Sequence, residues 1–367
     1  MAIAVQPGEK LGGFSFGIKE RFQWYSQFSD ELSEILFVGY NADYFTHLIL
    51  TNGDTILNSN SLPDDTLALI QKGYSAAAKK FSEIMGESRM SLSWYREYNF
   101  SYGRQLVSND DLSLYAGIGV KYLAGMGIME ARVNSGELEA FSAFSPAFPI
   151  DYGDSATTSN PSTVNSGGLL PKAVGSGVGF DIGVSVILGE KLKLGAALND
   201  IGSITWDGNV YQASDNELVD LSSSGFESFN FVTEAQKVIG ENGVFDWGGV
   251  VEKKVSLPTN LRIGASFMPN EKFEAGLDIV IPVNDVAGSY GNALLAFGVD
   301  ITPIPWLRLS TGASSGGYYG FNLPIGALVM IGEGSWEIGV ASRDVITFFT
   351  EDRPTLSLSA GFLRFRF

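Results

Sequence analysis

Charged residues recur in segments of this chain whose apolar side chains alternate with small or polar ones. Carboxylates and guanidinium groups in such places can act as a paired general acid and base, or can form charged ladders that line an enclosed polar space. The alternation favours the ladder, because it puts these residues on one face of extended segments. We predict that they line a lumen. The residues are Arg21, Asp181, Arg262, Glu274, Asp278, Asp300, Arg308, Glu337 and Arg343.

Other chemistry finds little support among the residue types. The chain has a single histidine, His47, so a Ser-His-Asp triad would have to use it. The glycine-rich run at residues 312–317 leads into Tyr318 and not into a helix, which argues against a phosphate loop. Residues 109–111 could be a cation loop, but a polar turn is the simpler explanation. We therefore predict a protein that is not an enzyme, with no catalytic residue, metal site or cofactor.

The elements that position the charges are predicted to be β-strands. Residues 353–367 alternate residue by residue, and Leu363, Phe365 and Phe367 share one face. A closing strand of a membrane barrel and an edge strand of a soluble sandwich both fit this segment alone. About thirteen segments share this period of two, among them residues 112–122 and 177–188.

Composition narrows the protein class. With 44 Gly, 12% aromatic and 18% charged residues, the 367-residue chain fits an all-β protein with close backbone packing. It has no Cys, which excludes a disulfide framework, and its net charge of -17 argues against nucleic-acid binding. No stretch reaches 18 consecutive apolar residues, so a transmembrane helix is not expected, whereas a barrel strand needs only roughly nine to eleven residues.

The connections between the segments differ in length at the two ends of the predicted strands. The three long ones, residues 25–88, 131–176 and 207–254, fall at one end, and short turns fall at the other. This asymmetry is typical of outer-membrane barrels, with long external loops and short periplasmic turns, and is not expected of a sandwich. We predict one transmembrane antiparallel β-barrel over residues 1–367, with the three long connections extracellular. About 14 strands are expected because bacterial barrels use even numbers, so one strand should precede Met1.

Three further expectations concern the loops, the strand ends and the N-terminus. An amphipathic helix is predicted within residues 61–86, and a weaker one at residues 229–239. Aromatic girdles are predicted at the two ends of the strands. The first residues lack the basic start and apolar core of a signal peptide, which indicates a mature or truncated product. The girdle residues are Trp24, Tyr25 and Trp206 at one end, and Tyr102, Trp306, Trp336 and Phe367 at the other.

Several strand-and-turn motifs resemble a known family. They are residues 94–104 (WYREYNFSYGR), 119–123 (GVKYL), 194–202 (LGAALNDIG) and 257–266 (LPTNLRIGAS). Together they resemble a family of Bacteroidota outer-membrane barrels of unassigned function, similar to FadL-type fatty-acid transporters and to PorV-like barrels of the type 9 secretion apparatus. The resemblance spans nearly the whole chain. It implies the bacterial outer membrane, contact with its lipid and lipopolysaccharide, and insertion by the barrel-assembly machinery, with Leu363, Phe365 and Phe367 as the signal. It carries over no ligand residue.

Two functions stay open at this point. The first is a channel or transporter for a small molecule, with a hydrophobic molecule as the finer expectation. About fourteen strands with a large insertion leave room for one narrow path or a plugged interior, which favours selective passage. The second is a structural or docking barrel that binds a protein of an envelope or type 9 secretion complex through its long acidic loops. An outer-membrane hydrolase would have to depend on His47.

Overall fold

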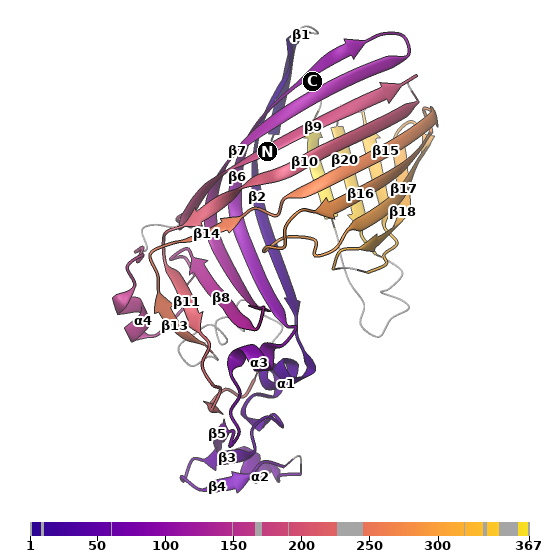
Figure 1. The fold of residues 1–367 in the computed structure, drawn as a ribbon. Coiled ribbons are helices and arrows are strands. Elements are labelled where there is room, and N and C mark those ends of the chain that lie inside the picture. Colours follow the sequence, from indigo (N-terminus) through magenta and orange to yellow (C-terminus); the bar gives the residue numbers. More distant parts are fainter. Residues whose placement is uncertain are drawn as a thin grey trace.

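The computed structural model is dominated by one large curved antiparallel sheet (Figure 1). It describes residues 2–8, 11–59, 61–148, 150–165, 171–189, 191–225, 245–318, 320–332, 336–344 and 359–365. Within these ranges no helix is long and apolar enough to cross a membrane.

Among the described residues the sheet has seventeen strands, of which four (β8, β11, β13 and β14) belong to an extension and thirteen form the wall. Each wall strand pairs antiparallel with the next one along the chain. This confirms the predicted all-β fold and its number of visible strands. The wall strands are β1 (Ala2–Gly8), β2 (Gly12–Gln27), β6 (Arg89–Ser108), β7 (Leu112–Asn134), β9 (Gly175–Leu188), β10 (Leu192–Trp206), β15 (Asn260–Asn270), β16 (Phe273–Pro282), β17 (Leu294–Ile304), β18 (Leu307–Gly316), β19 (Ile325–Ile331), β20 (Trp336–Ser342) and β21 (Ser359–Phe365).

The first and last wall strands, β1 and β21, are not paired with each other among the described residues. With thirteen strands that alternate in direction, β1 and β21 run the same way. The strand expected before Met1 stays a prediction. Leu363 and Phe365 fall in β21, whereas residues 353–358 and Phe367 lie outside the described residues.

The wall separates an apolar outside from a polar inside. On β7, Ile118, Val120 and Tyr122 point outward and are 51%, 42% and 54% exposed. The apolar positions of β7 stay in register with those of β9 from Leu112 opposite Leu188 to Tyr122 opposite Val178. At about 3.3 Å per residue and a tilt of about 40°, this stretch covers roughly 25 Å, the height of the apolar band of a membrane barrel.

The three long connections gather at one end of the wall, where β2, β6 and β7 continue beyond the belt into the extension (Figure 1). They contain further strands and short helices, so they are more ordered than simple loops. These elements are α1 (Asp30–Val38), η1 (Gly39–Asn41), β3 (His47–Leu50), β4 (Thr55–Leu57), α2 (Asp64–Leu67), β5 (Ile70–Tyr74), α3 (Phe81–Met85), β8 (Glu137–Phe144), α4 (Asp154–Ser159), β11 (Val210–Ser214), β12 (Asp220–Leu221), β13 (Asp246–Gly249) and β14 (Lys253–Ser256).

The single helix predicted within residues 61–86 is wrong. Helix α2 ends at Leu67, strand β5 follows, and α3 begins only at Phe81. Strand β5 pairs with β3, and Ile70 joins Leu48 in the core of a separate four-stranded sheet. A partner strand distant in sequence therefore overrides the helical spacing. The weaker helix predicted at residues 229–239 lies outside the described residues.

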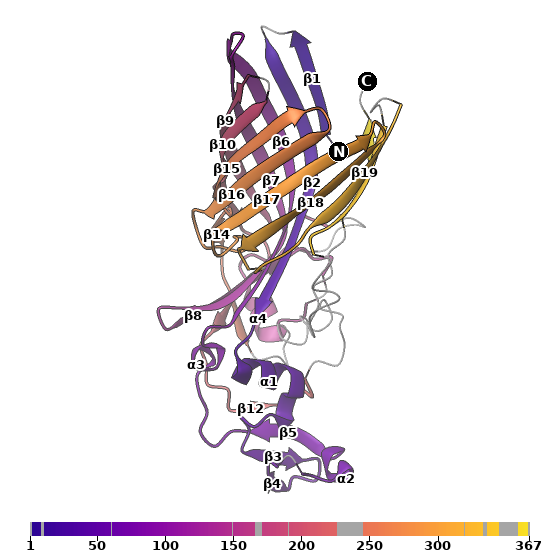
Figure 2. The ribbon, with the colours of Figure 1, turned by 90° about the vertical axis from the view of Figure 1, so that its right-hand side faces the viewer.

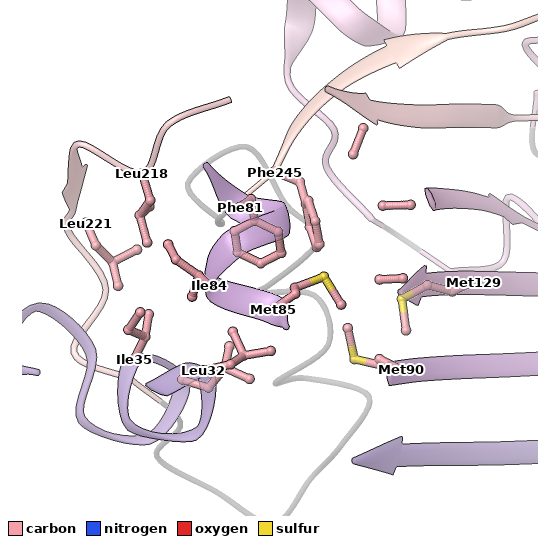
Figure 3. Close-up of a cluster of buried hydrophobic side chains, with 14 of the residues drawn as sticks. Leu32, Ile35, Phe81, Ile84, Met85, Met90, Met129, Leu218, Leu221 and Phe245 are labelled. Atoms are coloured by element: carbon pink, nitrogen blue, oxygen red, sulfur yellow. The ribbon is translucent and has the colours of Figure 1, made fainter. Parts of the chain in front are cut away.

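Two apolar cores hold the extension to the wall, one on each face of the continued β6–β7 sheet. On the face that continues the belt, α1 and α3 pack Leu32, Ile84 and Met85 toward Met90 and Met129 of the strands (Figure 3). The inner core is formed by buried side chains from β6 to β11 and from the segment before β15. Its main members are Tyr95, Leu123, Ile128, Phe141, Ile204, Trp206 and Leu257.

The girdle prediction is wrong for Trp206. Its indole is 1% exposed in the inner core and lies against Gly125, where a Cβ would come within 2.6 Å of the ring. The indole points inward and is therefore covered by protein and not by lipid. By contrast, Trp306 and Trp336, at the short-turn end, are 53% and 36% exposed.

Candidate functional site

The concave side of the wall lines an open cavity of about 1670 Å³. Glycines at inward positions widen it, because a residue without a side chain leaves the lumen free. Asp181, Arg262, Glu274, Asp278 and Asp300, all predicted as lumen residues, lie in its wall. Inward glycines in the wall include Gly117, Gly119, Gly183, Gly195, Gly264, Gly276 and Gly298.

Charged side chains on β15, β16 and β17 lie along the cavity wall. The guanidinium of Arg262 donates from Nε to Asp278 Oδ2 at 2.7 Å. Glu274 Oε1 accepts a hydrogen bond from Ser266 Oγ at 2.6 Å, and Asp300 stands directly opposite Glu274 on the next strand. These side chains form a ladder of mixed sign.

The remaining predicted lumen residues do not join this ladder. Glu337 on β20 is buried and lines a second cavity of about 520 Å³ beside β18 and β19. Arg308 on β18 is half-buried opposite Leu328 of β19. Arg343 follows the end of β20 and is exposed. The sequence placed Glu337 and Arg308 in strands, but it gave no distances between strands.

A buried group of charges crosses the lumen at the end of the large cavity nearest the extension. We call Arg21, Glu97, Lys121, Asp181 and Asp200 the cross-lumen cluster. Arg21 on β2 binds Glu97 Oε2 at 3.0 Å and reaches Asp200 Oδ2 on β10 at 2.9 Å. Lys121 Nζ lies 2.7 Å from Asp181 and 2.6 Å from Asp200. Lys121 is 3% and Glu97 1% exposed, so these charges depend on one another for solvation.

A β-bulge in β10 turns Asp200 into the lumen. Asp200 has φ +58°, and the register of β10 with β9 shifts between Leu198 and Ile201. The Asp200 N–H donates to Asp181 Oδ1 at 2.8 Å, which fixes the bulge. A bulge of this kind redirects a side chain and breaks the pairing of its strand. Beyond it β10 changes partner, from β15 to β14.

The segment that joins β14 to β15, residues 257–259, folds inward beside the bulge. Thr259 Oγ1 donates to the Asp200 carbonyl at 2.8 Å. Leu257 is 2% exposed and rests on Gly179, where a Cβ would come within 2.8 Å of its Cδ1. The cross-lumen cluster therefore lies between the polar cavity and the inner apolar core.

Sequence reasoning selected two members of the cross-lumen cluster, Arg21 and Asp181, and missed the other three. Glu97 and Lys121 follow the same alternation as the selected residues, so the pattern could have found them. Asp200 breaks the alternation together with Asn199. Two consecutive polar residues inside a strand indicate a bulge, and this signal was available in the sequence.

A second ionic group lies at the outer mouth, beyond the belt. We call Arg89, Glu130, Arg132, Glu139 and Asp285 the mouth cluster. Glu130 accepts from Arg89 at 3.0 Å, and Arg132 binds Glu139 at 2.9 Å. Burial raises the pKa of Glu130 above its ordinary value of 4.5, against the opposing effect of Arg132 and Arg89. The extra proton affinity shows that the two cations do not fully replace the lost hydration of this carboxylate.

The arrangement offers no catalytic constellation in the part of the chain that the structure describes. Residues 13–17 and 312–316 have the Gly-x-Ser-x-Gly spacing of a nucleophile elbow, but both run inside strands, β2 and β18. His47 lies in the four-stranded sheet at the far end of the extension (Figure 2). No group of three or more His, Cys, Asp or Glu residues in the described ranges could hold a metal ion. What the site can do is bind and orient a solute electrostatically.

Sequence comparison assigns the chain to a family without a known function. Residues 11–336 match the family described as "Family of unknown function (DUF5723)". The chain belongs to this family. No curated protein matches its sequence. The expected family of unassigned function is thus found, while the Bacteroidota origin and the likeness to PorV-like barrels stay predictions.

Several solved structures are similar to the chain. The toluene transporter TodX of Pseudomonas putida has 11% identity and a TM-score of 0.43, with 93% of this chain and 74% of that chain covered. The toluene transporter TbuX of Ralstonia pickettii has 11% identity, a TM-score of 0.39 and the same coverage. A FadL homologue of Pseudomonas aeruginosa has 11% identity and a TM-score of 0.39, over 93% of this chain and 67% of that one. At such scores the similarities decide nothing about function.

Proposed function

We propose that this family member is an outer-membrane β-barrel channel or transporter that carries a small solute through its lumen. The observation that carries the proposal is the two-sided wall. An exposed apolar belt of roughly 25 Å faces outward, and a charged cavity lies behind it. A soluble protein would not expose such a belt, because contiguous apolar surface of this extent drives association.

The nature of the solute is the finer part of the proposal. A hydrophobic molecule would need an apolar path, and one is offered by the inner core behind the cross-lumen cluster, with side chains such as Leu257 and Tyr95. The cavity wall itself carries glycines, serines and charges together with alanines and larger apolar residues, so it offers contacts to a polar solute as well as to an apolar one. The two solute classes therefore predict different routes past the same cluster.

Liposome uptake tests the proposal directly. Purified protein reconstituted into vesicles should pass a small solute, and a parallel series of monoaromatic hydrocarbons, fatty acids, sugars and amino acids would identify the class. Protein-free vesicles and heat-unfolded protein are the controls. Absence of flux for every solute would refute the channel. Membrane fractionation of the native host should find the chain with lipopolysaccharide, inserted by the barrel-assembly machinery.

The extension supports a second candidate, a barrel that docks a protein of an envelope or secretion complex. The four-stranded sheet β12-β5-β3-β4 lies at the far end of the extension from the wall (Figure 2) and contributes nothing to the cavity lining. It exposes apolar side chains, Leu57 at 70% and Tyr74 at 38%. If docking is the function, a stable envelope protein should co-purify with the full chain, and deletion of residues 43–79 should release it.

A further inference from the structure

The loop between β16 and β17, residues 283–292, reaches strands on the opposite part of the wall. We call it the bridging loop. In the sheet order, β6 and β16 are separated by β7, β9, β10 and β15. Nevertheless, Asp285 of this loop binds Arg89 at the outer end of β6, and its carbonyl accepts from Arg132 of β7 at 3.0 Å. A loop with these contacts must cross the outer mouth of the lumen.

The root of the bridging loop is held by neutral hydrogen bonds. Asn284 Nδ2 donates to the Leu257 carbonyl at 2.8 Å, and its Oδ1 accepts from the Thr259 N–H at 3.1 Å. The Val283 N–H donates to the Thr259 carbonyl at 2.8 Å. These bonds tie the loop to the inward segment 257–259 beside its own strand. They can persist while the rest of the loop moves.

The far part of the loop packs closely on the opposite wall. Ala287 and Ser289 are buried. Gly288 has φ +86° and lies against the side chain of Gln23 on β2, where a Cβ would overlap the amide oxygen. Only glycine combines this backbone conformation with so close an approach. The contact is shaped for one docked position of the loop.

Ionic contacts of Asp285 hold this docked position. Its carboxylate binds Arg89 and lies 3.4 Å from Arg132, and the same Arg89 also binds Tyr318 of the β18–β19 loop at 2.9 Å. Arg89 is 12% exposed but Asp285 60%, so water can reach this end of the pair. Such contacts break and reform more readily than the buried pairs of the cross-lumen cluster.

We propose that the bridging loop is a lid over the outer mouth of the lumen and that Asp285 is its latch. This inference rests on the proposed passage of a solute through the lumen. With the latch closed, the loop separates the extension from the cavity. With it open, the loop pivots on its root at residues 257–259, and the mouth is clear.

The absence of cysteine from the chain makes a locking experiment clean. In the double variant Arg89→Cys and Asp285→Cys the latch is removed, and a short bifunctional thiol reagent can restore the link covalently. Before the reagent, liposome flux should rise roughly fivefold, since Asp285 loses its partly exposed ion pairs with Arg89 and Arg132, and Glu130 loses its pair with Arg89. After it, flux should fall below that of the unmodified chain, and a reductant that cleaves the link should restore it.

Asp220→Asn is the matched control. It removes the same charge from an ion pair of similar geometry, Lys72 with Asp220 at 2.6 Å, but in the four-stranded sheet far from the mouth. Its flux should equal that of the unmodified chain. If flux changes neither when the latch is removed nor when the cross-link forms, the proposal of a lid is overturned.

Hydrogen exchange separates failure of the lid from failure of transport. In Asp285→Asn the amides of residues 283–292 should exchange faster, while Asp220→Asn leaves them unchanged. If no variant passes any solute but the amides respond as stated, the proposed function fails and the lid stands. If the amides of Asp285→Asn keep their protection, the lid is wrong whatever the flux.

Discussion

Replacing Lys121 by methionine tests whether the cross-lumen cluster holds the wall together. Methionine keeps much of the length and volume of lysine but removes the ammonium. The Lys121 side chain is 3% exposed, and its Nζ lies within 2.7 Å of carboxylates on two different strands, Asp181 on β9 and Asp200 on β10. The substitution leaves both carboxylates in place with less compensation for their lost hydration.

The cost follows from what remains around the two carboxylates. Removing one partner of a buried pair costs roughly 3–5 kcal/mol of folding free energy. Here Asp200 keeps Arg21 at 2.9 Å, and Asp181 keeps the Asp200 N–H at 2.8 Å. We therefore expect a loss near the lower limit, about 3 kcal/mol. Adding Asp181→Asn should recover part of it, with a coupling of roughly 0.5–3 kcal/mol, because the second change removes one of the uncompensated charges.

Urea unfolding in lipid vesicles, followed by tryptophan fluorescence, measures this loss. The midpoint should fall without a change in the slope, because the surface exposed on unfolding is the same. Lys193→Met is the control: Lys193 is 42% exposed and 3.9 Å from Glu274, so its loss should cost less than about 1 kcal/mol. Equal losses of unfolding free energy for the two lysine variants would refute the view that burial makes the cluster important for stability.

Three further predictions concern the belt, the inner core and the mouth cluster. Ile182→Arg, on the outward face of β9, should lower the free energy of unfolding in bilayers by about 2–4 kcal/mol. Ser185→Arg, on the inward face, should lower it far less. Equal losses of unfolding free energy in vesicles would contradict the assigned faces. Trp206→Ala should lower unfolding free energy by about 3–5 kcal/mol, whereas a loss under about 1 kcal/mol would place the indole in lipid. Because its folded pKa is raised, Glu130 contributes stability that is present below pH 4.5 and is lost as pH rises through that raised pKa. Glu130 is flanked by the Arg and carboxylate groups of the mouth cluster. The variant Glu130→Gln should therefore gain stability relative to the unmodified chain as pH rises above 4.5. A difference in stability that does not change with pH would exclude this titration.

The wall could be predicted because its cause is local. A strand between lipid and a polar interior must alternate at every residue, so residues 112–122 and 177–188 show their two faces without knowledge of their partners. The helix predicted around Ile70 failed for the opposite reason. Its apolar spacing fits a helix, but pairing with β3, which no local pattern shows, decides its conformation.

The contacts across the lumen could not be predicted from the sequence, for a geometric reason. Arg21 and Asp200 are 179 residues apart and meet only because the sheet curves and β10 bulges. Alternation tells which side a residue faces, not how far it is from the opposite wall. The same holds for Asp285, whose partners depend on where a loop crosses the mouth.

Thr259 links the two structures that cross the lumen. Its hydroxyl donates to the Asp200 carbonyl in the bulge, and its backbone binds Val283 and Asn284 at the root of the bridging loop. A shift in the cross-lumen cluster can therefore reach the lid through one residue. Thr259→Val keeps the shape and the backbone bonds but removes the hydroxyl, at a cost of about 1 kcal/mol.

In Thr259→Val we expect faster hydrogen exchange at residues 283–292 in addition to this modest loss. We also expect Lys121→Met to speed lid exchange in the unmodified background but much less in the Thr259→Val background. The comparison needs both backgrounds, because a general loss of stability would speed exchange equally in each. If Lys121→Met speeds exchange in the lid to the same extent with and without the Thr259 hydroxyl, the cross-lumen cluster and the bridging loop are independent. The bulge then stabilises the wall only.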